Sequence, residues 1–318
     1  MHDHPRGAIE LLDLAECRFR AMGTDVHIVA IDVVDDDLHW AAAEVARLES
    51  RWSRFRPDSD IGRVNAGAGR WVVVAQETLD LVAAAIDAWE RTGGAFDPLL
   101  GQSLAALGYD RTFDEVATAS AGRASGATRP GRRRSSTDVE IDLDGRAVRV
   151  APNRALDLGG IAKGWAADRL VERLLDRGAR GACVNIGGDV AAGGRAPHPS
   201  GWAIEIDHDA SVAPPRTVIV PAGGAATSTS LRRAWAGPDG DARHHLLDPV
   251  SAMPCGGDLV EVTVVAPAAA EAEVLTKVAF VAPSRLPDAL AAAGATATCT
   301  WADGRTSDVS VSGSCRAR

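Results

Sequence analysis

The clearest chemistry in the sequence lies between Asp157 and Lys163, where a carboxylate, two glycines and a lysine follow a short apolar run. The pattern predicts that a strand ends at Asp157 and that Gly159 and Gly160 form the turn into a helix. Free backbone N–H groups at the start of a helix can hold a phosphate or another anion. A tight turn that needs glycine only for its backbone angles accounts for the same residues equally well.

The predicted helix after these glycines has an apolar face at helical spacing, made of Ala167, Leu170, Val171, Leu174 and Leu175. Gly178 follows it, where a C-terminal cap favours glycine. Lys163 lies near the start of this helix, where the helix dipole slightly disfavours a positive charge. This misfit favours contact of Lys163 with a bound anion over a solvated side chain.

A second glycine pair, Gly187-Gly188, follows the apolar run 182–186 and precedes Asp189. This turn is a second candidate cradle for a phosphate or a ribose. His245 is the best candidate for moving a proton, because the pKa of an unperturbed histidine lies near neutrality. Asp248 follows three residues later and is placed to orient a loop beside it. A histidine next to another histidine, as His245 is next to His244, is more usually an exposed surface residue.

The elements that must position these residues are strands and helices in uneven alternation. Alternating apolar residues and turn signals predict strands at 19–33 with a turn near Gly23, 71–74, 139–150 with a hairpin turn at Asp144-Gly145, 182–186, 202–207, 217–220, 259–266 and a final pair within 296–311. Helical spacing predicts helices at 37–54, 78–89 with Thr78 as the cap, and 268–281. Hairpins mixed with crossover helices predict an α+β fold, with a mixed, largely antiparallel sheet and helices packed on one side.

The length and composition fit one domain with a sizeable core, since 46% of the 318 residues are hydrophobic. We expect this domain to span residues 18–311, after an N-terminal extension over 1–17 and before a C-terminal tail over 312–318. A segment rich in Gly, Ser and Ala predicts a mobile loop at about 115–137. The five cysteines form no CxxC pair, and their odd number argues against a disulfide framework.

The net charge and the N-terminal sequence limit the classes of partner and the cellular location that we expect. A net charge of −9 argues against a nucleic-acid or membrane surface. The N-terminal residues lack a secretory pattern, and no run approaches the ~20 apolar residues of a membrane span. We therefore expect a cytoplasmic protein with no nucleic-acid partner and no membrane partner.

Several motifs resemble those of the ApbE family, the flavin transferases that move FMN from FAD onto a protein Ser or Thr. The segment from Asp157 to Asp168 is similar to the family's central signature, D-L-G-G-I-A-K-G-hydrophobic-A-x-D. Further landmarks follow in the family's order: FRAMGT at 19–24, FRPDSDIGRVN at 55–65, GAFDPLLG at 94–101, VNIGGD at 184–189 and HLLDP at 245–249. The resemblance covers roughly residues 18–300.

This resemblance implies an FAD site in which Met22 packs on the flavin, the Thr227-Ser228 run lies near the phosphates, and His245 lies near the flavin. His245 and Asp248 are the implied catalytic residues. The implied FAD contacts are Met22, Asp97, Asp157, Gly159, Gly160, Lys163, Gly187, Gly188, Asp189, Thr227, Ser228 and His245.

Two places depart from the family pattern. Members usually hold Mg²⁺ with the side chains of an Asp-x-x-x-Thr motif and with a backbone carbonyl, which corresponds to Ala162 here. The matching side chains are Glu273 and Lys277, and a charged lysine cannot ligate a metal. These residues, at i and i+4 of a predicted helix, suit either an exposed salt bridge or an ammonium in place of the metal. The second departure is Leu231-Arg232-Arg233, where the family usually has an aromatic–acidic pair.

Transfer of FMN needs a cradle for the pyrophosphate, positive charge on its oxygens and a group that takes the hydroxyl proton. We therefore expect an FAD-binding flavin transferase that moves FMN to a Thr or Ser hydroxyl exposed on an acceptor flavoprotein and releases AMP. Mg²⁺ is expected only if the altered positions still hold it. Two other functions stay open: hydrolysis of the FAD pyrophosphate to FMN and AMP, and binding of FAD without catalysis.

Overall fold

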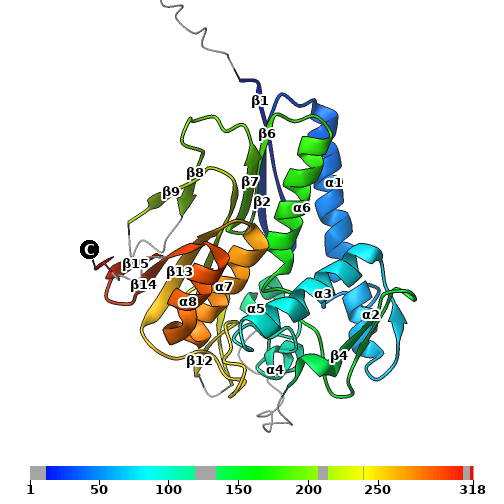
Figure 1. Cartoon of the computed structure of the whole chain (residues 1–318). Coiled ribbons are helices and arrows are strands. Elements are labelled where there is room, and N and C mark those ends of the chain that lie inside the picture. Colours follow the sequence, from blue (N-terminus) through cyan, green and yellow to red (C-terminus); the bar gives the residue numbers. More distant parts are fainter. Residues whose placement is uncertain (1–11, 119–133, 207–213, 239, 311–315, 318) are drawn as a thin grey trace, which may run out of the picture.

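The computed structural model describes residues 12–118, 134–206, 214–238, 240–310 and 316–317 (Figure 1). Within these residues, a nine-stranded sheet has the order β1-β2-β6-β7-β10-β13-β14-β15-β16, and every neighbouring pair in it is antiparallel. Its strands are β1 (Leu14–Ala21), β2 (Thr24–Ile31), β6 (Gly181–Ile186), β7 (Asp189–Gly194), β10 (Gly223–Thr229), β13 (Leu259–Ala266), β14 (Thr296–Trp301), β15 (Thr306–Val309) and β16 (Arg316–Ala317).

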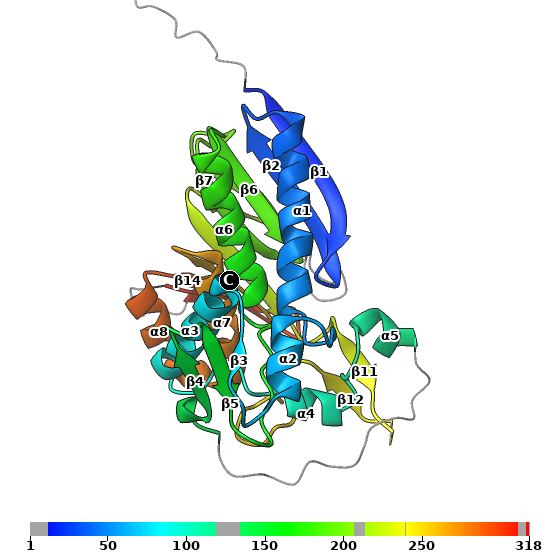
Figure 2. The same cartoon turned by 90° about the vertical axis from the view of Figure 1, so that its right-hand side faces the viewer.

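Three helices cover one face of this sheet: α1 (Asp35–Trp52), α6 (Ala162–Asp176) and α7 (Ala269–Val281). Figure 2 shows α1 and α6 running along the strands of the N-terminal half of the sheet. The other face is covered by an antiparallel hairpin of β8 (Trp202–Ile206) and β9 (Arg216–Val220). The predicted α+β fold, with a largely antiparallel sheet and helices on one side, is therefore confirmed. The expected sheet was also mixed, but no parallel pair occurs in the large sheet within the described residues.

Alternation along the strands explains the two layers. On β6, Ala182, Val184 and Ile186 pack into the core beneath the helices, whereas Cys183 packs into the cluster beneath the hairpin. Successive side chains of a strand point to opposite faces, so one strand serves both cores. The long run of buried residues on β6 follows from this double coverage.

Most of the remaining elements lie beyond the end of the large sheet, whereas the helix Leu286–Ala293 packs against α7 and β14 (Figure 1). They comprise α2 (Asp60–Ala66), α3 (Gln76–Arg91), α4 (Gly101–Ala106), α5 (Phe113–Thr118), α8 (Leu286–Ala293), the short turns η1 (Ser136–Asp138) and η2 (Pro283–Arg285), the sheet β3 (Val72–Val73)-β5 (Ala147–Val150)-β4 (Val139–Asp142), and the pair β11 (Ala234–Ala236)-β12 (Ala242–His244). β4 and β5 form the predicted hairpin around Asp144-Gly145. In the part of the chain that the structure describes, no helix is long and apolar enough to cross a membrane.

Two local expectations differ from the structure. The run before Asp157 is not a strand; instead, the Asn65 side chain donates to the Leu156 carbonyl and accepts from the Leu156 N–H, at 2.9 and 2.7 Å. The cap of α3 is Ala75 and not Thr78, whose buried hydroxyl donates to Asp60 at 2.7 Å. In both cases a partner far along the chain determines the local conformation.

The expected boundaries also move. β1 begins at Leu14, inside the expected N-terminal extension, because Leu14 pairs with Ile31 of β2. β16 lies inside the expected C-terminal tail and pairs with β15. Of the expected mobile loop, the first residues belong to α5 and the last to η1, while residues 119–133 lie outside the described residues. The described cysteines, Cys17, Cys183, Cys255 and Cys299, are free.

Candidate active site

A cavity of about 840 Å³ opens where the start of α6, the turns β1–β2 and β6–β7, the end of β10 and the segment around His245 meet. It collects most of the residues singled out in the sequence. Those that line it are Met22, Asp97, Asp157, Gly159, Gly160, Ala162, Lys163, Gly187, Gly188, Asp189, Thr227, Ser228, His245 and Lys277. Glu273 is fully buried behind the wall, and Asp248 is not part of the lining.

The first glycine turn is held by Asp157. One carboxylate oxygen accepts from the Gly159 N–H at 2.7 Å, and the other pairs with Arg54 Nε at 2.9 Å. Neither glycine has a positive φ, so the backbone-angle explanation does not apply. A Cβ on Gly160 would lie 3.1 Å from Phe96 and 3.3 Å from Lys277 Cε. Glycine is needed at 160 for space on the cavity wall.

The second glycine turn does need special backbone angles. Gly187 and Gly188 have φ values of 66° and 93°, and the Asn185 side chain accepts from the Gly188 N–H at 2.8 Å. A Cβ on Gly187 would lie 2.4 Å from Thr24 Oγ1. The β6–β7 turn therefore packs directly against the β1–β2 turn.

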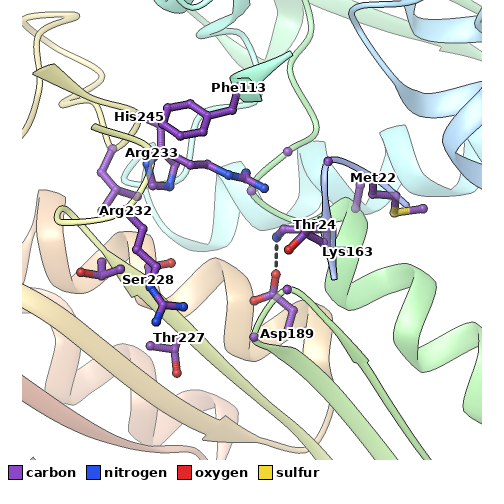
Figure 3. A pocket seen from close by; sticks show the side chains of 18 of the residues that line it. Met22, Thr24, Phe113, Lys163, Asp189, Thr227, Ser228, Arg232, Arg233 and His245 are labelled. Atoms are coloured by element: carbon purple, nitrogen blue, oxygen red, sulfur yellow. Dashed lines mark hydrogen bonds and ion pairs between the residues drawn. The ribbon is translucent and has the colours of Figure 1, made fainter. Parts of the chain in front are cut away.

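Met22 lies in that neighbouring β1–β2 turn with a φ of 53°. The left-handed region is uncommon for a residue with a side chain, and such conformations gather at functional sites. Figure 3 shows Met22 toward one side of the cavity and His245 with Phe113 toward the other. The strained turn thus places an apolar, flexible side chain at the cavity edge.

Lys163 and Lys277 form a buried charge cluster with two carboxylates. Lys163 Nζ contacts the Asp189 carboxylate (Figure 3) and lies 2.5 Å from Glu273 Oε1. Glu273 Oε2 accepts from the Gly164 N–H at 2.9 Å. Lys277 Nζ lies 3.8 Å from Glu273 Oε1. Since Glu273 is fully buried, the alternative of an exposed Glu273–Lys277 salt bridge is wrong.

Burial and neighbouring charges act against each other in this cluster. Burial lowers the pKa of Lys163, but Asp189 and Glu273 outweigh it and leave the pKa above its usual value. Burial, together with Glu273, raises the pKa of Asp189 to about 6 despite the opposing effect of Lys163. Burial lowers the pKa of Lys277, against the attraction of Glu273. Lys163 is therefore firmly charged and already paired, whereas Lys277 is the more weakly paired ammonium.

His245 is a neutral base in the cavity wall. Burial first, and then Arg233 and Lys277, lower its pKa well below the usual 6.5. Its Nδ1 is buried and has no hydrogen-bond partner among the residues that the structure describes. In the tautomer with the proton on Nε2, Nδ1 is free to accept a proton from a ligand at neutral pH.

Asp97 and Asp248 mainly hold turns. Asp248 accepts from the Val250 N–H at 2.8 Å and from the Ser251 hydroxyl at 3.0 Å, which fixes the loop after His245, as expected. Asp97 accepts from the Leu99 N–H at 2.8 Å and pairs with Arg134 Nε at 2.5 Å. Its carboxylate therefore reaches the cavity already paired.

Several residues in or beside the cavity were not expected from the sequence. Arg134 also donates to the Pro249 carbonyl, so it joins the Asp97 turn to the loop after His245. Arg54 stacks over the rings of Phe55 and Tyr109, with its central carbon 4.1 and 4.8 Å from the ring centroids. Tyr109 lies outside every recognised motif, and Arg134 belongs to the segment that was expected to form a mobile loop. Their roles come from contacts between distant segments.

The positions expected at a Mg²⁺ site do not offer a ligand set for a divalent cation. Both oxygens of Glu273 are occupied, one by Lys163 and the other by the Gly164 N–H. Lys277 brings a positive charge where the family pattern has a hydroxyl. Thr276, one residue earlier, donates its hydroxyl to the Glu273 carbonyl at 2.7 Å. Within the residues that the structure describes, there is no group of three or more His, Cys, Asp or Glu side chains that could hold a metal ion.

Comparison with known proteins gives consistent matches along most of the chain. A model of the ApbE family matches residues 22–299. A Treponema pallidum protein named FAD:protein FMN transferase is 31% identical over 266 residues, which cover 77% of this chain and 72% of that protein. A Vibrio cholerae protein of the same name is 28% identical over 226 residues, covering 68% and 64% of the two chains.

Solved structures match the whole fold. The crystal structure of an ApbE protein from Thermotoga maritima has a TM-score of 0.77 at 25% identity and covers 96% of this chain and 97% of that one. The apo form of the flavinyl transferase ApbE from Pseudomonas stutzeri gives a TM-score of 0.74 at 25% identity, with 96% and 95% covered. The large sheet and its helices are thus similar to those of these proteins.

Proposed function

This chain belongs to the ApbE family, and from that premise we propose that it is an FAD:protein FMN transferase. It binds FAD, transfers FMN to a Ser or Thr hydroxyl on an acceptor flavoprotein and releases AMP. The observation that carries the proposal is the shared cavity: a neutral His245 with an unpartnered Nδ1 lines the same space as two glycine turns and a cluster of cations.

The cavity supports binding of a dinucleotide. Its volume of about 840 Å³ lies toward the upper end of small-molecule sites. The turn containing Gly187 and Gly188, and the polar Thr227-Ser228 run at the end of β10, bring backbone and hydroxyl groups to one side. Met22 and Phe113 add apolar surface for a ring system.

The chemistry is a phosphoryl transfer. The acceptor hydroxyl oxygen forms a bond to the FMN phosphorus, and the bond from that phosphorus to the bridging pyrophosphate oxygen breaks. The hydroxyl proton passes to His245 Nδ1, and AMP leaves with the bridging oxygen. Because His245 is neutral at neutral pH, it can take this proton without first losing one. Asp248 acts indirectly, by fixing the loop that holds His245.

A second candidate function follows from the poor match at the metal position. The altered cluster at Glu273 and Lys277 would polarise the pyrophosphate only weakly in that case. Water would then attack the phosphorus slowly in place of the acceptor hydroxyl, or no reaction would follow. The chain would then be an FAD hydrolase or an FAD-binding protein without catalysis.

The deciding experiment incubates the purified chain with FAD in three arms: alone, with a flavin-acceptor domain, and with the same domain after its acceptor Thr is changed to Val. Transferase activity gives AMP and a fluorescent acceptor band in the second arm only. AMP without a fluorescent band identifies a hydrolase, and FAD binding without AMP identifies a binder. Location in the cytoplasm stays a prediction, which cell fractionation would test.

A further inference from the structure

Lysine is almost absent from this chain: Lys163 and Lys277 are the only two lysines among the 34 lysine and arginine residues. Both line the cavity, and both form ion pairs with the fully buried Glu273. Elsewhere the sequence uses arginine for positive charge. A lysine ammonium is a compact point charge, whereas a guanidinium is a planar fork. The two places that carry a compact cation are therefore the two that meet at this carboxylate.

We propose that the Lys277 ammonium takes the place of Mg²⁺, so that this protein binds the pyrophosphate of FAD without a metal ion. The inference rests on the proposed function, because it presupposes that FAD is the ligand. It concerns the source of the positive charge at the phosphates, which the family pattern assigns to a divalent ion.

The surroundings of Lys277 hold its ammonium in a fixed place. Nζ lies 3.2 Å from Ser228 Oγ and 3.8 Å from Glu273 Oε1. Its Cε lies 3.3 Å from the position that a Cβ on Gly160 would take. The ammonium therefore sits between the first glycine turn and the Thr-Ser run, the two segments expected beside the phosphates.

The charges at the two places where the sequence departs from the family pattern support the same inference. Lys163 and Lys277 balance Asp189 and Glu273 when all four are ionised, so the cluster by itself is neutral. Arg232 and Arg233 line the same cavity, at the second place where the sequence departs from the family pattern. Both departures add positive charge to one cavity. A pyrophosphate, which is dianionic, gains from that charge in a partly buried site.

The first test is a calorimetric titration of FAD into the intact chain, once with EDTA and once with Mg²⁺. We expect the same affinity in both. An affinity that appears only with Mg²⁺ overturns the inference and leaves the proposed function standing. Absence of FAD binding in both conditions overturns the proposed function, and the inference with it.

The second test removes the ammonium. Lys277→Gln should weaken FAD binding about 10-fold to 100-fold, with or without Mg²⁺, because a hydrogen bond to a charged group is lost. Glu273 keeps Lys163 and the Gly164 N–H, so the fold has no unpaired buried carboxylate; thermal unfolding checks this. The matched control is Arg305→Gln, which removes one positive charge from an exposed turn outside the cavity and should leave the affinity unchanged. Equal affinity of Lys277→Gln and the unmodified chain contradicts the inference.

The third test restores the family pattern. The double variant Glu273→Asp with Lys277→Thr should bind FAD weakly with EDTA and regain affinity with Mg²⁺. If the FAD affinity of the double variant is the same with EDTA and with Mg²⁺, position 277 does not decide the metal requirement, and this result contradicts the inference.

A fourth measurement observes the two lysines directly in the unmodified chain and needs a variant only to assign their signals. With ¹³C-labelled lysine, the spectrum contains signals from only two side chains, and Lys277→Gln or Lys163→Gln assigns them. FAD should shift the Lys277 signal in the presence of EDTA, while Mg²⁺ alone should leave both unchanged. A Lys277 signal that moves with Mg²⁺ alone, or stays still with saturating FAD, contradicts the inference.

Discussion

At the scale of single residues, the cavity combines a neutral base with two lysine ammonium groups that are paired to different degrees. The sequence allowed His245, Lys163 and the glycine turns to be predicted as site residues, because their types and local spacing are distinctive. It could not reveal that Lys163 is paired, because its partners lie 26 residues away at Asp189 and 110 residues away at Glu273. A local pattern contains no record of which distant carboxylate a buried ammonium meets.

His245→Ala should lower the rate of FMN transfer by ~10²-fold or more while FAD affinity changes little. The reason is that a general base acts on the hydroxyl proton and carries little of the ligand's binding energy. Single-turnover rates and calorimetric affinities measured on the same preparation separate the two effects. Parallel losses of rate and affinity would make His245 a residue that only positions FAD.

His245 should also make the stability of the fold depend on pH. Its pKa is lowered in the folded protein and lies near 6.5 when unfolded, so its contribution is complete above about pH 6.5 and is lost as pH falls toward the folded pKa. The loss is at most about 1.4 kcal/mol per pH unit. Urea unfolding at about pH 7 and about pH 5 should show a smaller loss in His245→Asn than in the unmodified chain. Identical losses would show that His245 is protonated equally easily in both states.

At the scale of elements, α6 and α7 are joined by a cap that one helix provides to the other. The N-cap of α7, Ala268, has no capping side chain. Asp168 of α6 accepts instead from the Ala269 and Ala270 N–H groups, at 2.8 and 2.9 Å. The helices themselves were predictable from their apolar spacing. The cap was not predictable, because Asp168 lies in the middle of α6 and contacts the start of α7 only after the two helices have packed.

Asp168→Asn should lower the free energy of unfolding by ~1–2 kcal/mol, because one of two capping acceptors becomes a donor. Urea unfolding measures the change. Asp87→Asn is the matched control, since among the described residues its exposed carboxylate pairs with Arg91 alone, at i+4, and such pairs contribute below about 1 kcal/mol. Similar losses in the two variants would argue against a capping role.

At the scale of the whole molecule, the cavity lies between the end of the large sheet and the segments of the α1–α4 region. Its wall takes Gly188 and Asp189 from the sheet, and Arg54, Phe55 and Asp97 from the α1–α4 region. The order of motifs along the sequence indicated that these segments serve one site. The contacts of Arg134 with Asp97 and with the Pro249 carbonyl form only when the segments come together in the fold.

FAD should therefore stabilise the molecule as one unit. At a hundred times its Kd, a ligand that binds only the folded state adds about 2.7 kcal/mol, and a single unfolding transition should move to higher denaturant. FMN at the same concentration should add less, because it lacks the pyrophosphate bridge and the adenylate. Equal stabilisation by FMN would remove the support for a pyrophosphate cradle.

The scarcity of lysine has a practical consequence. A protease that cuts only after lysine has two cleavage points in the entire sequence, one in the first turn of α6 and one within α7. Both lie in the cavity wall, so neither can be cut until those helices open. Proteolysis by such an enzyme would ignore the surface loops and report only the opening of the site, and a ligand that closes the cavity would be seen as resistance to digestion.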